Sequence, residues 1–232
     1  MKPLGHKAYG HIPHLQGSRM TPADKHCEIG QQNIATVKTR DKHDFILVQE
    51  KLDGSNCSVA KINDEIIALT RSGYLAETSP YIQHQYFAKW VQKNKNRFNA
   101  ILENNERIVG EWLIQACGTR YNLQHEPFVV FDIMVKHERI IYEILYERVK
   151  NDFIIPKLIH KGTPISIDDV LTKLEPSGHG AIDMVEGAIW RVERKNKVDF
   201  LCKYVRPEKK DGIYLPEISG KEVIWNVNPD CL

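Results

Sequence analysis

The stretch from Ile46 to Ala60 reads ILVQEKLDGSNCSVA. Two apolar runs, rich in β-branched residues, flank a short polar core, which predicts two buried strands joined by a turn. Asp53-Gly54 is the turn signal, because glycine tolerates a positive φ without steric cost. We therefore expect Lys51 at the mouth of a strand–turn–strand unit. A lysine amine there can act as a nucleophile once desolvation or nearby positive charge lowers its pKa.

The K-x-D-G tetrapeptide at residues 51–54 does not by itself distinguish such a site from a surface hairpin with a solvated lysine. Chance alone places K-x-D-G in roughly a few per cent of chains of this length. The remaining charged residues therefore have to decide between the two interpretations.

Composition limits the class of protein. The chain has 232 residues, of which 42% are hydrophobic, enough for one sizeable domain. The formal charge is +2, from 32 basic and 30 acidic residues, so any basic surface has to be local. Five scattered cysteines without a C-x-x-C pair are typical of reduced thiols, and argue against a disulfide framework or a zinc site. With neither an apolar leader nor a membrane-length run, the sequence predicts a cytoplasmic protein with no membrane partner.

Organisation along the chain follows from hydrophobic periodicity. We expect one domain over 1–232, with an irregular N-terminal arm (1–33), a C-terminal wrapping tail (207–232) and no separate C-terminal domain. The pattern predicts strands over residues 34–37, 45–48, 58–61, 65–70, 108–114, 128–135, 184–192 and 198–206. Helices are predicted from Ser79, as an N-cap followed by Pro80, and over residues 142–150 and 166–174.

The N-terminal arm allows two interpretations. It is either a packed surface loop or a strap over a nucleotide pocket, in which His14 and Arg19 offer donors to phosphate. The spacing of its histidines fits no helix face, and no cysteine accompanies them, so a metal site there is rejected.

Charged residues recur inside or beside the apolar strands, where a charge needs pairing, hydrogen bonds or a metal. Glu111 and Asp132 interrupt two such strands, and for Asp132 a buried pair with an arginine is a fair structural alternative. The ordered set of charged and aromatic candidates is Lys51, Arg71, Glu111, Phe131, Asp132, Glu186 and Lys203.

These segments together resemble the RNA ligase family of the covalent lysine nucleotidyltransferase superfamily. Residues 51–56 match its K-x-D/H-G-x-N motif, and Glu50 matches the acid that often precedes it. The further motifs correspond to residues 71–73, 110–113, 130–132, 186–189 and 202–204, so the resemblance spans about residues 46–206.

The resemblance implies a role for each matching residue. Lys51 would form lysyl-AMP, and Lys203, near it, would bind phosphates and depress its pKa by like-charge repulsion. Glu111 and Glu186 would hold Mg²⁺, with Mn²⁺ able to substitute. The resemblance further implies nucleotide contacts, with Phe131 stacking on the purine, for Glu50, Asp53, Gly54, Asn56, Arg71, Glu111, Phe131 and Asp132.

One departure concerns the last motif, which in the family often reads K-x-K. Here Leu201 and Val205 flank Lys203, so one lysine is available, and Arg206 or Arg19 are the candidates to compensate at the phosphates or RNA. The stretch after Lys203 is also too short for the extra RNA-engaging domain of many relatives.

The sequence thus predicts an α+β fold, with antiparallel β-sheets around a nucleotide pocket and peripheral helices, of the nucleotidyltransferase or ATP-grasp-like ligase type. The expected function is an ATP-dependent RNA ligase that joins RNA 3′-OH and 5′-phosphate ends, with ATP as substrate and Mg²⁺ as metal. Two alternatives stay open. One is a DNA ligase or capping guanylyltransferase, against which Asn56 argues, and the other is a nucleotide- or RNA-binding module that does not seal.

Overall fold

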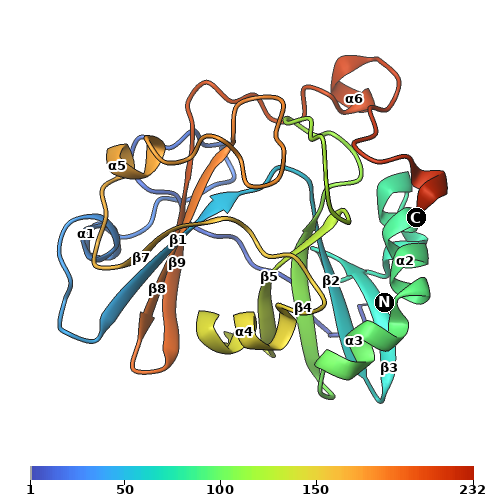
Figure 1. Cartoon of the computed structure of the whole chain (residues 1–232), viewed down its shortest axis with the longest axis horizontal. Helices are drawn as coiled ribbons and strands as arrows, with labels where there is room; N and C mark the ends of the chain where they lie inside the picture. Colours follow the sequence, from blue (N-terminus) through green and yellow to red (C-terminus); the bar gives the residue numbers. More distant parts are fainter. Residues whose placement is uncertain (1) are drawn as a thin grey trace.

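The computed structural model describes residues 2–232 and contains two antiparallel β-sheets with helices around them (Figure 1). Sheet A has four strands in the order β7-β1-β8-β9, and sheet B has five in the order β3-β2-β4-β5-β6. The two sheets lie on the left and right of Figure 1, with helices at both outer ends and one, α4 (Tyr142–Val149), between them in this view. This is the α+β architecture that the sequence predicts.

Sheet A is built on β1 (Asp44–Lys51), which pairs on one side with β7 (Leu158–Gly162) and on the other with β8 (Gly187–Arg194). The edge strand β9 (Lys197–Val205) pairs with β8. Ile46 and Val48 of β1 and Ala188, Trp190 and Val192 of β8 are buried, and they pack with residues of α1 (Ile29–Thr36) and α5 (Ile167–Leu171). The apolar run of β1 therefore carries Lys51 to the carboxyl end of a central strand.

Sheet B contains the strands of the other apolar runs, namely β2 (Ser55–Ile62), β3 (Glu65–Thr70), β4 (Glu106–Trp112), β5 (Phe128–Val135) and β6 (Glu138–Arg139). A buried aromatic cluster that includes Phe87, Trp90, Phe98, Trp112 and Phe128 joins this sheet to its helices. Those helices are α2 (Ile82–Lys93), α3 (Lys95–Ile101) and α4 (Tyr142–Val149). These ring contacts pack β4 and β5, the strands that carry Glu111 and Phe131, against the helices.

The link from β1 to β2 differs from the expected hairpin. Lys51 ends a strand of sheet A, whereas Ser55 begins a strand of sheet B, so the turn crosses from one sheet to the other. Gly54 does not adopt a positive φ. Its role is close approach, because a Cβ there would lie 2.6 Å from the carbonyl oxygen of Trp112. The crossing places the K-x-D-G segment between the two sheets.

Two helix assignments are corrected by the structure. Residues 34–37, expected as a strand, are instead the last residues of α1 and its C-cap. At the other end of this helix, Glu28 and Gln31 form a capping box that starts it. Helix α2 begins at Ile82 rather than after Ser79, whose hydroxyl instead bonds the ring of His84 and accepts from the Tyr81 N–H. Short helical turns complete the fold at Ala76–Thr78 (η1), Pro216–Ser219 (α6) and Pro229–Cys231 (η2).

The N-terminal arm bridges the two sheets. In Figure 1 it runs from beside β3 across to α1. The Tyr9 N–H donates to the carbonyl oxygen of Arg71, which directly follows β3 of sheet B, at 3.2 Å. On the sheet A side, the Lys203 N–H donates to Pro13 O at 2.9 Å, and the Leu15 N–H donates to Lys203 O at 2.8 Å. The arm is therefore hydrogen-bonded to both sides of the space between the sheets.

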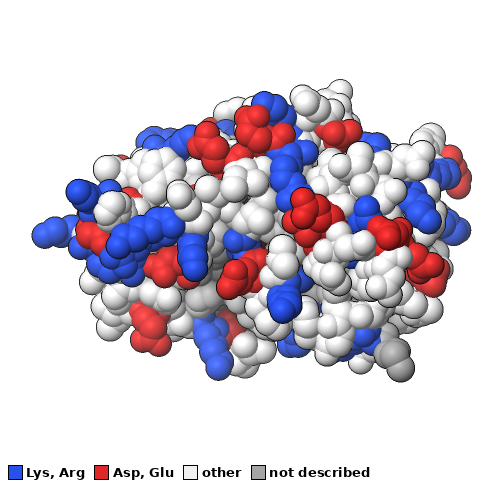
Figure 2. Space-filling view, turned by 90° about the horizontal axis from the view of Figure 1, so that it is seen from below, with Lys and Arg blue, Asp and Glu red and all other residues white. Residues whose placement is uncertain are grey.

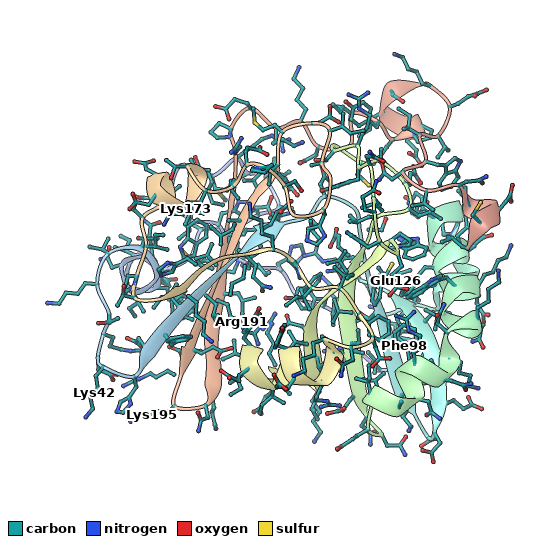
Figure 3. All side chains as sticks on the ribbon, in the orientation of Figure 1. Lys42, Phe98, Glu126, Lys173, Arg191 and Lys195 are labelled. Carbon is teal, nitrogen blue, oxygen red and sulfur yellow. The ribbon has the colours of Figure 1, made fainter. Side chains whose placement is uncertain are left out.

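The surface carries no single dominant charge in the view of Figure 2, where blue and red side chains are interspersed, with more blue at the end formed by sheet A. Figure 3 places Lys42 and Lys195 at that outer end, and Arg191 between the two sheets. None of the helices described within residues 2–232 has the length and apolar character needed to cross a bilayer.

Candidate active site

Between the sheets lies an inner cavity of about 140 Å³, which adjoins an outer hollow of about 700 Å³. The inner cavity has apolar walls from both sheets, including Leu52, Phe131, Pro156, Ile189 and Leu201. The outer hollow is larger, and the residues that line it alone include Lys7, His11, Asp53 and Glu217. Both spaces are lined by Tyr9, Lys51, Asn56, Arg71 and Glu111, so these residues lie at the junction.

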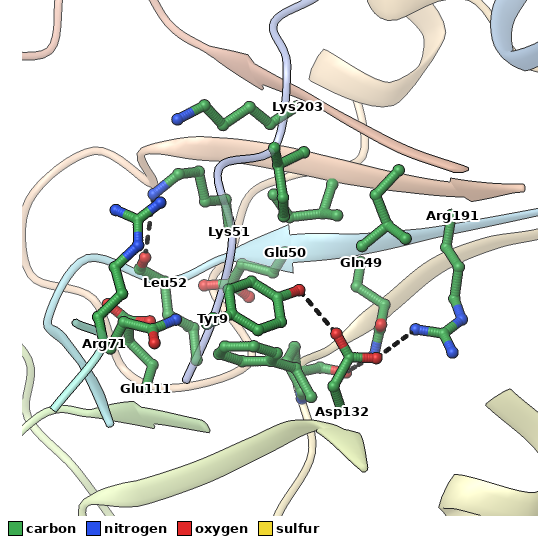
Figure 4. A pocket seen from close by; sticks show the side chains of 16 residues that line it. Tyr9, Gln49, Glu50, Lys51, Leu52, Arg71, Glu111, Asp132, Arg191 and Lys203 are labelled. Atoms are coloured by element: carbon green, nitrogen blue, oxygen red, sulfur yellow. Dashed lines mark hydrogen bonds and ion pairs between the residues drawn. The ribbon is translucent and has the colours of Figure 1, made fainter. Parts of the chain in front are cut away.

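Lys51 is at this junction, with its side chain 20% exposed (Figure 4). Its ammonium donates to Glu186 Oε2 at 2.5 Å and to Leu52 O at 3.4 Å. Burial acts to lower the pKa of Lys51, but Glu186, Glu111 and Asp53 outweigh it and raise the pKa above its ordinary value. The expectation that Lys203 would depress this pKa is therefore wrong for the protein alone, because three acids surround the amine.

The two glutamates around Lys51 are themselves unusual. Burial raises the pKa of Glu186 and that of Glu111 to about 7. The Glu111 carboxylate accepts a hydrogen bond from the Gly54 N–H at 3.1 Å. Asn56 is the cross-strand partner of Glu111, and its buried Oδ1 has no hydrogen-bond partner among the described residues. A buried acceptor without a hydrogen-bond partner, next to two acids with raised pKa values, is typical of a site that binds a ligand.

Two cations complete the junction. Lys203 lies on β9 opposite Ile189, and its ammonium is 3.6 Å from Asp24. Its pKa is lowered, first by burial and then by repulsion from Lys51. Arg71 follows β3, is exposed, and donates to Gly10 O at 3.2 Å. Both therefore present positive charge to the space in front of Lys51 (Figure 4).

Glu50 lines the inner cavity but is held by a loop. Its side chain accepts from the Ser177 hydroxyl at 2.5 Å and from the Gly178 N–H at 2.8 Å. Burial raises the pKa of Glu50. The same loop continues into His179, whose ring bonds His125 and the Lys157 N–H. Glu50 is thus fixed in orientation at the cavity wall.

Asp132 follows the structural alternative. It is fully buried, and its Oδ1 accepts from Arg191 Nη1 at 2.6 Å. Its Oδ2 accepts from the Tyr9 hydroxyl at 2.6 Å and from Arg139 Nε at 3.0 Å (Figure 4). Both oxygens are engaged by the protein, so Asp132 joins the two sheets and the arm. Its neighbour Phe131 remains on the cavity wall, 5.4 Å from the Tyr9 ring.

Asp53 does not line the inner cavity but lines the outer hollow. Its Oδ2 accepts from the Thr119 hydroxyl at 3.0 Å, and its N–H donates to the Tyr121 hydroxyl at 3.0 Å. Burial raises its pKa, against the attraction of Lys51 and Lys209. The turn after Lys51 is therefore anchored by the loop at residues 117–121.

The three tentative phosphate or RNA residues lie outside the pocket lining. His14 is buried, with Nδ1 bonded to the Ser18 hydroxyl and Nε2 3.2 Å from Asp24, so its ring is engaged within the fold. Arg19 forms an ion pair with Asp211 at 2.6 Å, and Arg206 lies 3.5 Å from Glu175. The arm does reach the pocket, but through Tyr9 and Ile12 rather than through His14 and Arg19.

Two residues at the site were missed from the sequence. Tyr9 has a weak signal, as an aromatic residue followed three positions later by Ile12 in a polar arm. Lys209 is 7% exposed and donates to three oxygens beneath the turn at Asp53, yet it occurs in the polar run PEKKDG. Only tertiary contacts reveal that lysine.

The residues present fit a hydrated divalent ion better than a protein-only metal cage. Within the part of the chain that the structure describes, no group of three or more His, Cys, Asp or Glu side chains is arranged to hold a metal. Glu111 and Glu186 offer hard oxygens, and Asn56 Oδ1 is an unused acceptor. Mg²⁺ usually takes one or two carboxylates, with waters and substrate phosphates completing its coordination.

Comparison with known proteins decides the family. The RNA ligase family model matches residues 44–205, which is more than half of the chain. The chain belongs to the RNA ligase family. A search of curated protein sequences finds no match.

Solved structures agree on the fold of this RNA ligase family member. An archaeal ATP-dependent RNA ligase superposes with a TM-score of 0.53 at 17% identity, covering 85% of this chain and 48% of that chain. A Naegleria gruberi RNA ligase variant with ATP and Mn gives 0.53 at 17% identity, with 93% and 64% covered. A putative ATP-dependent DNA ligase from Aquifex aeolicus gives 0.50 at 17%, with 85% and 49% covered. The chain thus spans about half to two thirds of the length of these relatives.

Proposed function

We propose that this protein is an ATP-dependent RNA ligase that joins RNA 3′-OH and 5′-phosphate ends. The observation that carries the proposal is the Lys51 amine, held 2.5 Å from Glu186 at the junction of an inner cavity, with Leu52, Phe131 and Ile189 on its wall, and a larger outer hollow. Membership of the RNA ligase family supports it. The ATP and Mn named for the Naegleria ligase variant support ATP and a divalent ion as the ligands.

The shape of the pocket suggests how ATP would bind. The apolar inner cavity suits an adenine base, with Phe131 and Tyr9 on its wall and Glu50 fixed beside it. The triphosphate would then extend past Lys51 into the hollow lined by Arg71. Asp132, whose oxygens are both engaged, would act through the orientation of Tyr9 rather than by touching the nucleotide.

In the first step, the Lys51 amine would attack the α-phosphorus of ATP. A phosphorus–nitrogen bond forms, the bond from the α-phosphorus to the bridging oxygen breaks, and pyrophosphate leaves. Lys51 has to lose its proton first, and Glu186 Oε2 is the nearest acceptor. Lys203 and Arg71 would stabilise the charge that develops on the phosphate oxygens. A divalent ion held by Glu111, Glu186 and Asn56 would supply further positive charge and offset the acids that keep Lys51 protonated.

In the later steps, AMP would pass from Lys51 to the RNA 5′-phosphate, and a 3′-hydroxyl would attack that phosphate and expel AMP. The lysine nitrogen–phosphorus bond breaks as the pyrophosphate linkage to RNA forms. The first two transfers take place at the same α-phosphorus, so Lys203 and Arg71 would serve both. The third takes place at the phosphorus of the RNA 5′-phosphate, where the 3′-oxygen bond forms, the bond to AMP breaks and the hydroxyl proton is released.

The test uses the purified chain with α-labelled ATP or GTP and Mg²⁺, followed by sealing assays on nicked RNA and nicked DNA. The proposal expects an acid-labile protein–AMP adduct with ATP, and sealing of RNA. An adduct with GTP would favour a capping-type guanylyltransferase, and sealing confined to DNA would favour a DNA ligase. Absence of any adduct would leave a nucleotide- or RNA-binding module.

A further inference from the structure

A buried lysine that does not line the pocket lies beneath the turn after Lys51. The Lys209 ammonium donates to Gly118 O at 2.9 Å, Thr119 Oγ1 at 2.7 Å and Met184 O at 3.0 Å. Its three protons are thereby all used. Within residues 2–232, no carboxylate lies within ion-pair distance of it. Asp53 attracts it only across the intervening Thr119 hydroxyl. A buried cation with no acid in direct contact is costly, so its presence here needs a reason.

Two of the three acceptors connect Lys209 to the chain segments that carry Lys51 and Glu186. Thr119 accepts from Lys209 and donates its own hydroxyl proton to Asp53 Oδ2 at 3.0 Å, two residues after Lys51. Met184, whose carbonyl accepts directly, is two residues before Glu186. One ammonium therefore holds the backbone that follows the nucleophile and the backbone that precedes its carboxylate partner.

The packing around this ammonium leaves little room for adjustment. A Cβ on Gly118 would lie 2.6 Å from Asp53 Oδ2 and 2.7 Å from Lys210 O. The Tyr214 N–H donates to Cys117 O at 2.9 Å on the far side of the same loop. Residues 117–119 are thus enclosed between the turn at Asp53 and the C-terminal segment. A shift of that segment would be transmitted to the turn.

We propose that Lys209 is a positioning residue, which fixes Asp53 and Glu186 around Lys51 without contacting the nucleotide. This inference rests on the proposed role of Lys51 in adenylylation. Its removal should slow the attack on ATP by roughly 10- to 100-fold, because small misplacements of a nucleophile cost that much. The affinity for ATP should change less than about threefold, since Lys209 makes no hydrogen bond to Phe131, Arg71 or Lys203, the groups proposed to bind the base and the phosphates.

The test compares Lys209→Met with Lys210→Met in single-turnover adenylylation over a range of ATP concentrations. Both variants remove one ammonium from adjacent residues, but Lys210 is exposed. The proposal expects a lower maximal rate with unchanged half-saturation for Lys209→Met, and wild-type behaviour for Lys210→Met. Equal rates for the two folded variants would overturn it.

The route through Thr119 provides a test if Lys209→Met fails to fold. Thr119→Val keeps the shape of the side chain but removes the hydroxyl that links Lys209 to Asp53, whereas Thr119→Ser keeps the hydroxyl. The proposal expects a slow maximal rate for the valine variant and rescue by serine. A valine variant with the wild-type rate would contradict a role for the Lys209–Thr119–Asp53 hydrogen bonds in positioning Lys51.

A chemical readout separates this inference from the proposed function. Acylation of the Lys51 amine by an N-hydroxysuccinimide ester can be followed by peptide mass spectrometry without ATP. Loosening of the Lys51–Glu186 pair should make Lys51 acylate several-fold faster when Lys209, or the Thr119 hydroxyl, is removed, and not in Lys210→Met. If wild type forms no adduct with ATP, the proposed function fails, and this comparison still decides the role of Lys209. Equal rates of Lys51 acylation in wild type and all variants would overturn the positioning role of Lys209.

Discussion

Two groups of buried charge lie at the same pocket and differ in how far the protein satisfies them. The first, the Asp132 group, consists of Asp132, Arg139, Arg191 and Tyr9, and gives both Asp132 oxygens donors at 2.6 to 3.0 Å. The second, the Lys51 group, consists of Lys51, Glu111, Glu186 and Asn56. It holds two acids with a pKa raised to about 7, and an amide oxygen that lacks a partner among the described residues.

The difference separates structure from function on physical grounds. A fully bonded buried network recovers its desolvation cost within the protein and specifies one arrangement. A partly bonded one is unfavourable until another group supplies the missing partners. The Asp132 group therefore holds the two sheets and the arm together, and the Lys51 group is ready for a charged ligand.

The largest expected effect is on chemistry at Lys51. Lys51→Ala should reduce formation of the AMP adduct on the order of 10⁴-fold or more, the scale seen when a nucleophile is removed. The fold should be retained, because the side chain lies at a pocket junction. Adduct formation is measured with α-labelled ATP, and the fold by circular dichroism. Lys42→Ala, at the outer end of sheet A, is the control and should label normally. Unfolding of Lys51→Ala would assign the lysine a structural role.

The next effect sets the two groups directly against each other. Asp132→Ala should lower the free energy of unfolding by about 3–5 kcal/mol, because it removes the buried carboxylate that pairs with both Arg191 and Arg139. Glu186→Gln should change it by less than about 1 kcal/mol, since burial already disfavours the Glu186 charge, yet it should abolish labelling. Urea denaturation measures both variants. Equal losses of stability would remove the distinction between the groups.

A pH effect of intermediate size tests the loop that holds Glu50. Burial, followed by repulsion from His125, lowers the pKa of His179 from 6.5 to about 4. Between pH 6.5 and pH 4 the unfolded chain binds a proton at His179 that the folded chain does not. The contribution of His179 to the free energy of unfolding is therefore fully present above pH 6.5 and is lost as the pH falls toward 4. The loss approaches about 3 kcal/mol.

The matched variant is His179→Gln, which removes the titrating group while keeping an acceptor for the Lys157 N–H. Urea unfolding at pH 7 and at pH 4.5 should show a smaller drop in stability for this variant than for wild type. Parallel pH profiles would mean that His179 is protonated to the same extent in both states.

The smallest expected effect concerns Asn56. Asn56→Ala should leave the free energy of unfolding unchanged or slightly raised, because Oδ1 loses no partner from the described part of the fold. Binding of ATP with Mg²⁺ should weaken about tenfold, the value of one hydrogen bond to a charged group. Calorimetric titration and urea denaturation give the two numbers. A loss of stability without loss of affinity would move Asn56 into the structural group.

Sequence patterns predicted the elements whose local preference and tertiary burial agree. Strand β5 occupies the predicted residues 128–135, because its apolar run is long and bounded by polar residues. The end of α1 was assigned as a strand because Ile34 to Val37 is an apolar run. There a capping box fixed the helix instead, and Val37 is 72% exposed.

The pocket lining was predictable where a charge interrupts an apolar strand, as at Glu111 and Lys203. Three features depend on contacts between distant segments, and the sequence offered at most a weak signal for them that names no partner. These are the engagement of Asp132 by Arg191, the closure of the pocket by Tyr9, and the burial of Lys209. The raised pKa of Lys51 also required the structure, since the sequence does not say how many acids surround the amine.

The most direct test of the central claim is peptide mass spectrometry after incubation of the protein with ATP and Mg²⁺. The account predicts AMP on the peptide that contains Lys51, with fragmentation locating it on that side chain, and no such adduct in Glu186→Gln. AMP on a different residue, or an unmodified Lys51 peptide from active, folded protein, would contradict it.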